Sequence, residues 1–178
     1  HYYIYDGNPR TFDIQENYSN LLINRSALIP HIQESLKIKK QMIQKDEFDT
    51  DQRRVFNYGH TFGHAIETLS DYKIPHGQAV TLGMDLANYV SYRMGFLSID
   101  KFNLMNKVLR KNIPAFNATD KIDNYMRILS KDKKNINKTI VCILAADFGQ
   151  LFVHQISDKE KLKELILEYF GGKHEEHS

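Results

Sequence analysis

Three histidines in one short part of the chain have the residue type and spacing for metal binding or proton transfer. The segment "NYGHTFGHAIE" places His60 and His64 four residues apart, and "IPHGQAV" adds His76. Imidazole binds divalent metals and also exchanges protons near neutral pH. Residues four apart lie on the same face of a helix. The alternative is that these histidines are polar residues on the solvent-facing side of a helix.

Other polar residues fall on the same side of this predicted helix. With an advance of about 100° per residue, the polar side chains form a stripe roughly 80° wide. They are Asp49, Arg53, Asn57, His60, His64 and Glu67. Apolar residues such as Phe56, Phe62 and Leu69 cover most of the remaining circumference. Because buried polar groups need partners, the stripe favours a cleft that holds a metal, a phosphate or both.

The spacing leaves two metal-binding pairs open. His60 and His64 could chelate one ion, but no Glu follows His60 directly, so "HTFGH" is not the zinc-protease motif. Alternatively, His76 could fold back beside His60 after a turn. That pair would need a carboxylate and an open position to form a catalytic zinc site. The remaining histidines are expected at the surface or in the tail: His1, His31, His154, His174 and His177.

Most of the chain has the three-to-four apolar spacing of helices. Residues 12–29 and 31–45 predict two helices, with Pro30 as the break between them or a first-turn residue. Residues 49–70 predict a third helix. Residues 77–95 are apolar on most sides, which predicts a central helix. Within it, Gly83 and Ala87 would let another helix approach closely.

The period changes toward the carboxyl end. Shorter helices are expected at residues 101–112 and 119–131. Residues 139–145 and 150–156 are then β-rich and predict a hairpin. A last helix follows, with Ser157 and Glu160 as its capping box and Gly171 at its end. The expected fold is mainly α, with several helices and one small β-hairpin.

Composition limits the classes of protein. With 178 residues, 42% of them hydrophobic, the chain can bury one core, so residues 1–178 are expected to form a single helical domain. The net charge of +2, with the two signs interspersed, lacks the basic footprint of a nucleic-acid-binding protein. No apolar stretch approaches the ~20 residues that span a membrane. The single Cys142, in an apolar run, is expected to be buried and fits a cytoplasmic protein.

Taken together, two segments resemble a known family. "DEFDTDQRRVFNYGHTFGHAIE", followed by "HGQAVTLGM", closely resembles the carboxyl-terminal helical domain of 3-dehydroquinate synthase and related sugar-phosphate cyclases. The resemblance runs from the first residues to "KDKKNINKTIVCIL" and includes Lys39 in "IKKQMI". It implies a lyase of the shikimate pathway that closes a seven-carbon sugar acid phosphate into 3-dehydroquinate and releases phosphate. It also implies zinc and NAD as cofactors, and homodimers are common in the family.

The resemblance also implies roles for individual residues. His60 and His76 match the family's zinc ligands, and His64 matches a histidine beside the substrate. Lys39 matches a lysine that holds the anionic groups of the substrate, and Asp49 stands where the family usually has a catalytic Glu. The other substrate-binding positions implied are Arg53, Asn57 and one of the pair Lys133 and Lys134.

These roles agree with the chemistry of the side chains. Zinc polarises a hydroxyl and the carbonyl formed from it. A neutral His64 could accept the alcohol proton. Arg53 offers a fork for two anionic oxygens, and lysines offer point charges for phosphate.

Two expected parts are missing from the sequence. The family's third zinc ligand, a Glu in a Glu-x-x-Lys motif, would precede His1, and no glycine-rich turn between a strand and a helix is present to bind NAD. We therefore expect the amino-terminal NAD-binding domain to be absent from this chain. On its own, the chain is predicted to bind NAD poorly, to hold zinc weakly and to be inactive.

Departures from the family pattern leave the substrate open. Gln78 stands where the family usually has Glu, and Asp49 is one methylene shorter than Glu, which moves the carboxylate by more than about 1 Å. One alternative is therefore a cyclase that acts on another sugar phosphate. A second is a metal-dependent polyol or alcohol dehydrogenase, although a neutral polyol needs no anion-binding Arg53. A third is a non-catalytic helical module that retains the motif for packing.

Overall fold

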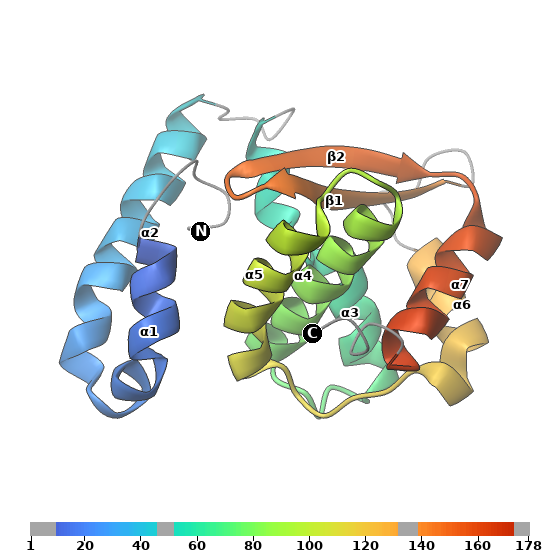
Figure 1. The fold of residues 1–178 in the computed structure, drawn as a ribbon, viewed down its shortest axis with the longest axis horizontal. Coiled ribbons are helices and arrows are strands. Elements are labelled where there is room, and N and C mark those ends of the chain that lie inside the picture. Colours follow the sequence, from blue (N-terminus) through green and yellow to red (C-terminus); the bar gives the residue numbers. More distant parts are fainter. Residues whose placement is uncertain (1–9, 46–51, 132–138, 173–178) are drawn as a thin grey trace.

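The computed structural model describes residues 10–45, 52–131 and 139–172. In these ranges it contains seven α-helices and one two-stranded antiparallel sheet, which confirms the predicted mainly-α fold with one hairpin (Figure 1). The elements in chain order are α1 (Arg10–Ile23), α2 (Arg25–Lys45), the 3-10 helix η1 (Gln52–Asn57), α3 (His60–Leu69), α4 (His76–Arg93), α5 (Ile99–Leu109), η2 (Arg110–Asn112), η3 (Thr119–Lys121), α6 (Ile122–Ser130), β1 (Ile140–Asp147), β2 (Gln150–Ile156) and α7 (Lys159–Phe170). Of the helices in these ranges, none combines the length and apolarity that a membrane span requires.

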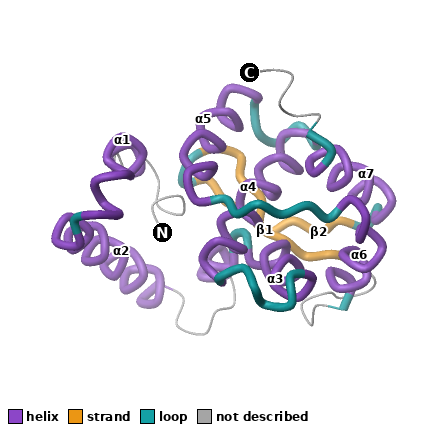
Figure 2. Tube along the Cα trace, turned by 90° about the horizontal axis from the view of Figure 1, so that it is seen from below, coloured by secondary structure: helices purple, strands orange, loops and turns teal. Residues whose placement is uncertain are grey.

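Helices α1 and α2 lie side by side, to one side of the other helices (Figures 1 and 2). The chain breaks between them at Asn24, whose side-chain oxygen accepts hydrogen bonds from the backbone N and the Oγ of Ser26. The predicted break at Pro30 is wrong, because Pro30 lies inside α2. A proline this near the helix start removes one backbone hydrogen bond, whereas Asn24 supplies the capping oxygen that starts a new helix.

Helix α4 is the centre of the core, as its apolar sequence predicts. It contacts α3, α5, α7 and β1. Leu86, Ala87 and Val90 are fully buried along it. The hairpin lies across the ends of these helices, with α6 and α7 together at the far side from α1 and α2 (Figure 1). This packing fixes the start of α4 relative to α3, where the histidines lie.

Three glycines let α3 cross α4 at very short range. A Cβ atom added to Gly83 would lie 2.1 Å from the carbonyl oxygen of Gly59 and 2.6 Å from the backbone N of Gly63. A Cβ on Gly63 would in turn lie 3.0 Å from the carbonyl oxygen of Ala79. The predicted close approach at Gly83 is therefore confirmed. The absence of side chains at these positions lets the start of α3 pack directly on the first half of α4.

The hairpin covers the core where β1 packs against α3 and α4. Strands β1 and β2 pair antiparallel from Ile140 opposite Ile156, with an irregularity between Ala145 and Asp147. Residues 140–145 of β1 are all buried. Cys142 is among them, as predicted, and burial raises the pKa of its thiol to about 12. The hairpin is tied to the helices because the Oγ atom of Ser91 donates a hydrogen bond of 2.6 Å to the carbonyl of Ala145.

The last helix, α7, begins one residue later than the predicted capping box requires. Its N-cap is Asp158, whose carboxylate accepts a hydrogen bond of 2.9 Å from the backbone N of Lys161. The prediction of Ser157 as the cap is therefore wrong. Ser and Asp are both good N-cap residues, so their order alone does not decide which one is used. Gly171 ends the helix, as expected.

Candidate functional site

A cluster of three imidazoles forms where α3 and α4 begin. His60 is the first residue of α3, and His76 is the first residue of α4. Their ring centroids are 5.4 Å apart. The ring of His64 lies 5.5 Å from that of His60 and 6.0 Å from that of His76. The chain thus folds back after the turn and brings His76 beside His60, as the second of the two sequence hypotheses expects.

The polar stripe predicted on one continuous helix is broken in the structure. The residues before the histidines form the 3-10 helix η1, and the chain then turns at Gly59, which has a left-handed backbone with φ 77°. Only His60, His64 and Glu67 of the predicted stripe therefore lie on α3. A Cβ at Gly59 would approach the carbonyl oxygen of Val80 to 2.6 Å, so the packing against α4 also requires glycine here.

The ring of His60 is oriented by the backbone of the preceding turn. Its Nδ1 lies 3.2 Å from the carbonyl oxygen of Tyr58. Because a carbonyl oxygen can only accept a hydrogen bond, Nδ1 carries the proton, and the lone pair of the neutral ring is on Nε2. This is the usual state of a metal-binding histidine, in which the second nitrogen donates to a backbone carbonyl or a carboxylate.

His76 is held by a carboxylate. Its Nδ1 lies 3.0 Å from Oε1 of Glu67. The side chain of His76 is 57% exposed, whereas that of Glu67 is only 12% exposed. The turn between the helices makes this contact possible. Asp71 and Tyr72 both adopt left-handed backbone, and the backbone N of Tyr72 donates to the carbonyl oxygen of Glu67.

The donor set is chemically suited to a divalent transition metal. Imidazoles and a carboxylate are the ligands that zinc and cobalt accept in proteins. In the described ranges, one group of possible ligands is His64, Glu67 and His76, whose ligand atoms all lie within 4.8 Å of one another. His60 lies beside this group, with its ring near both other imidazoles. Two ligand sets are thus possible geometrically: His60 with His76, or His64 with Glu67 and His76.

The other predicted site residues lie on different elements. Lys39 is exposed on α2, directly after the buried Ile38, and its side chain forms no hydrogen bond or ion pair with the described residues. Asn57 ends η1, and its Nδ2 donates to the carbonyl oxygen of Arg54 at 3.2 Å. Arg53 is also in η1, and the structure describes only its backbone. Asp49, Lys133 and Lys134 lie outside the described residues.

Glu67 contacts His76, although the family resemblance implies no role for it. It lies in the polar stripe, three residues after His64 and seven after His60, which is the spacing of one helix face. Its place on the histidine face of α3 is therefore readable from the sequence. Its partner His76 belongs to the next helix, so the contact depends on the intervening turn.

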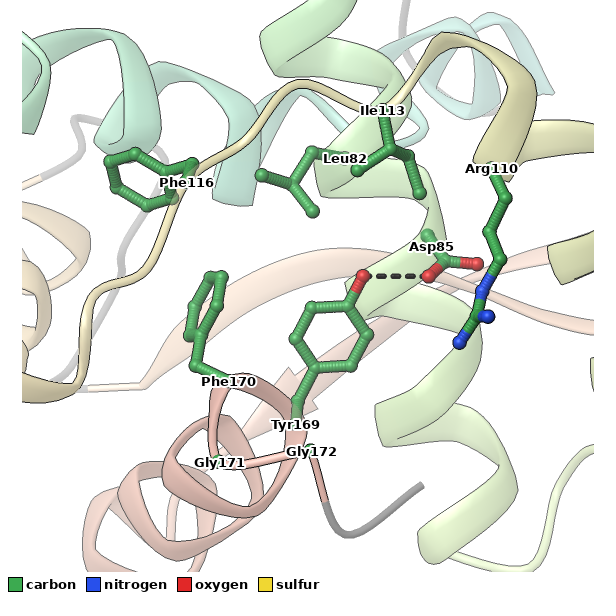
Figure 3. A pocket seen from close by; sticks show the side chains of 9 residues that line it. All are labelled: Leu82, Asp85, Arg110, Ile113, Phe116, Tyr169, Phe170, Gly171 and Gly172. Atoms are coloured by element: carbon green, nitrogen blue, oxygen red, sulfur yellow. Dashed lines mark hydrogen bonds between the residues drawn. The ribbon is translucent and has the colours of Figure 1, made fainter. Parts of the chain in front are cut away.

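A cavity in the described part of the chain lies away from the histidines. It has a volume of about 390 Å³ and lies between the middle of α4, η2, the loop after it and the end of α7 (Figure 3). Leu82, Ile113 and Phe116 form part of its apolar lining. None of the predicted site residues lines it. The histidine cluster, in contrast, lies on an open face, because His64 and His76 are exposed.

The buried carboxylate of this cavity already has hydrogen-bond partners. The Asp85 side chain is 1% exposed and accepts a hydrogen bond of 2.6 Å from the hydroxyl of Tyr169 (Figure 3). The amide of Asn106 donates to both oxygens of the same carboxylate at 2.9 Å. Burial, followed by the nearby Asp85, raises the pKa of Tyr169 well above its ordinary value. We therefore interpret this network as a structural link between α4, α5 and α7.

Comparison with known sequences supports the resemblance. The family model for the 3-dehydroquinate synthase C-terminal domain matches residues 3–135. The 3-dehydroquinate synthase of Campylobacter hominis is 37% identical over 141 residues, which are 78% of this chain and 40% of that enzyme. The enzyme of Dictyoglomus thermophilum is 33% identical over 162 residues, 89% of this chain and 46% of that enzyme. The chain thus spans less than half the length of these curated relatives.

Two solved structures share the arrangement of elements. One is 2-epi-5-epi-valiolone synthase from Streptomyces hygroscopicus, with NAD+ and Zn2+ bound; its TM-score is 0.74 at 17% identity, over 92% of this chain and 47% of that one. This likeness concerns the fold alone. The other is 2-deoxy-scyllo-inosose synthase complexed with carbaglucose-6-phosphate, NAD+ and Co2+. Its TM-score is 0.58 at 25% identity, over 68% of this chain and 35% of that one. The chain therefore belongs to the 3-dehydroquinate synthase family and corresponds to its carboxyl-terminal domain.

Proposed function

We propose that the chain is the metal- and substrate-binding domain of a zinc- and NAD-dependent lyase. The enzyme would close a seven-carbon sugar acid phosphate into 3-dehydroquinate and release phosphate. The observation that carries the proposal is the cluster of His60, His64 and His76, which packing of α3 on α4 assembles in a chain whose relatives are 3-dehydroquinate synthases. Our assignment of zinc to the first and last of these histidines rests on the resemblance alone.

In this proposal, His60 and His76 hold the metal through Nε2. The tautomers support it, because Nδ1 of each ring is hydrogen-bonded to an acceptor. When bound, zinc would polarise the substrate hydroxyl and the carbonyl formed from it. His64 would then lie next to the reacting hydroxyl. Its ring, 5.5 Å from that of His60, is close enough to the metal ligands to accept or pass on a proton.

The anionic groups of the substrate would be bound from other elements. We assign this role to Arg53 and Asn57 on η1, Lys39 on α2, and one of Lys133 and Lys134. Arg53 can bind two oxygens at once, and the lysines supply point charges to phosphate. Asp49 takes the place of the catalytic Glu in the family. The proximity of η1 to α3 supports these roles, since only Tyr58 and Gly59 separate Asn57 from His60.

NAD would bind to a part of the enzyme that precedes this domain. The curated relatives are more than twice as long as the portion matched here, and two solved structures with a similar fold contain NAD+. The open face at the histidines supports this arrangement, because a catalytic metal site needs further groups to bury the substrate. We expect the third metal ligand to come from that part too. The small-molecule substrate would bind between the two parts, and the assembly would be a homodimer.

A second candidate is a cyclase acting on a different sugar phosphate. It is favoured by Gln78, which replaces the Glu usual in 3-dehydroquinate synthases, and by Asp49, which replaces a longer carboxylate. It is also supported by the similar structure of 2-deoxy-scyllo-inosose synthase, which is complexed with carbaglucose-6-phosphate. The two candidates share the metal site and differ in the sugar.

The experiment is a phosphate-release assay on the full-length protein that contains this chain, with NAD present. The substrates are 3-deoxy-D-arabino-heptulosonate 7-phosphate, a heptulose phosphate without the carboxylate, and glucose 6-phosphate. We expect release from the first, abolished by a chelator and restored by zinc. Release from one of the others only would establish the second candidate. No release from any of them, by protein shown to contain zinc and NAD, would contradict both.

A further inference from the structure

We propose that Glu67 is the positioning residue that holds His76 in its metal-binding orientation and is not itself a metal ligand. This inference rests on the proposed function, because it presupposes that the histidine cluster binds a divalent metal. It concerns a residue that the family resemblance did not single out. The evidence is the hydrogen bond of Glu67, its burial and its place on α3.

The hydrogen bond determines which nitrogen of His76 can bind metal. A carboxylate accepts hydrogen bonds, so Nδ1 of His76, 3.0 Å from Oε1 of Glu67, carries a proton. The lone pair of the neutral ring is then on Nε2, which points away from Glu67. His60 has the same tautomer, set by the carbonyl of Tyr58. Both rings are thus prepared to bind one ion through the same nitrogen.

Burial makes Glu67 the fixed partner and His76 the partner that is held. The carboxylate belongs to the well-packed helix α3, where it is 12% exposed, whereas the imidazole is 57% exposed. An exposed side chain loses rotamer freedom when it binds a ligand. A hydrogen bond that fixes the ring beforehand reduces this loss. In metal sites generally, such a carboxylate also raises the basicity of the imidazole.

The rival arrangement makes Glu67 a direct ligand with His64 and His76, whose ligand atoms lie within 4.8 Å of one another. In that case the ion would replace the proton on Nδ1 of His76, and the observed hydrogen bond would be lost. His60 would then stand outside the site, although its Nδ1, like that of His76, is hydrogen-bonded to an acceptor. In our arrangement residue 67 must accept a hydrogen bond from His76. In the rival arrangement it must bind the ion through its carboxylate.

The test is a competition titration of zinc against a chromophoric chelator, using the metal-free full-length protein. Removal of an outer hydrogen-bond partner typically weakens metal binding by about 10–100-fold, and we expect that loss for Glu67→Ala. Glu67→Gln keeps an oxygen that can accept the Nδ1 proton, so its loss should be less than about 10-fold. Glu164→Ala, which removes an exposed glutamate of α7, is the control and should not change the affinity.

A second readout needs no metal. Nitrogen NMR of the metal-free protein should show the Nδ1-protonated tautomer of His76 in the unmodified protein. This tautomer should lose population in Glu67→Ala, while circular dichroism shows an intact fold.

The possible outcomes separate the inference from the proposed function. Equal and large losses of affinity in Glu67→Ala and Glu67→Gln would make Glu67 a direct ligand and overturn the inference. Unchanged affinity in both variants would also overturn it. If the unmodified protein failed to bind zinc, the proposed function itself would fall.

Discussion

Substitution of Gly83 by Ala tests whether the close crossing of α3 and α4 builds the site. The new Cβ would lie 2.1 Å from the carbonyl oxygen of Gly59, about 1.3 Å closer than the 3.4 Å at which ordinary contact begins. The second contact, 2.6 Å to the backbone N of Gly63, is also with backbone, so no side chain can rotate away. Overpacking of this kind costs about 1–3 kcal/mol or more. The gain of about 0.5–1 kcal/mol from replacing glycine within a helix offsets only part of this.

We therefore expect Gly83→Ala to reduce the free energy of unfolding by about 2 kcal/mol, or about 4–8 °C in the unfolding temperature of a domain this size. Because α3 must move away from α4, zinc affinity should fall as well. The control is Gly77→Ala in the same helix, where a Cβ meets nothing within 4 Å. It should be neutral or stabilise by about 0.5–1 kcal/mol. Thermal unfolding and zinc titration measure both effects. Equal unfolding temperatures for the two variants would refute the reasoning.

Three further predictions concern stability. Asp158→Ala should lower the free energy of unfolding in urea by about 0.5–2 kcal/mol, because it removes the N-cap of α7. Ser157→Ala should change it by less than about 0.5 kcal/mol. A larger loss for Ser157→Ala than for Asp158→Ala would show that Ser157 is the cap. Tyr169→Phe should cost about 1–3 kcal/mol by the same assay, since it removes a hydrogen bond to the buried Asp85; an unchanged urea midpoint would argue against the network as a link to α7. Burial raises the pKa of the Cys142 thiol in the folded protein to about 12, against an ordinary value of 9.0. The unfolded chain therefore loses this proton at lower pH than the folded protein does. The contribution to stability is complete below about pH 9 and is lost as the pH rises toward about 12. Between pH 9 and 10 the unfolding free energy should therefore fall more steeply, by up to about 1.4 kcal/mol per pH unit, than in Cys142→Ala; parallel pH profiles would contradict the assignment.

Periodicity was sufficient to predict the central part of the fold. The apolar circumference of residues 77–95 predicted the buried helix α4, and the change to period two predicted the hairpin. Gly83 also indicated a close helix contact, because a glycine in an otherwise apolar helix leaves room for backbone. Each of these features follows from the pattern of apolar residues within a single segment, because that pattern determines which face of the helix or strand is buried.

The details that sequence could not provide depend on contacts between distant residues. The break before His60 follows from the left-handed Gly59 packed against α4, whereas periodicity alone continues the helix through it. The contact between Glu67 and His76 follows a turn with left-handed backbone at Asp71 and Tyr72. Asp is enriched in this conformation but Tyr is not, so the sequence does not predict two such residues in a row. The sequence hypothesis that His76 lies beside His60 is correct, but the sequence does not identify Glu67 as the carboxylate that contacts His76.

The most direct test of the account is the position of the metal itself. Crystals of the zinc-loaded full-length protein, measured at the zinc absorption edge, would show it as an anomalous peak. We predict a peak bound by Nε2 of His60 and Nε2 of His76, with the hydrogen bond between Glu67 and His76 intact. A peak bound by His64 and the Glu67 carboxylate, or a zinc ion bound away from these histidines, would contradict it.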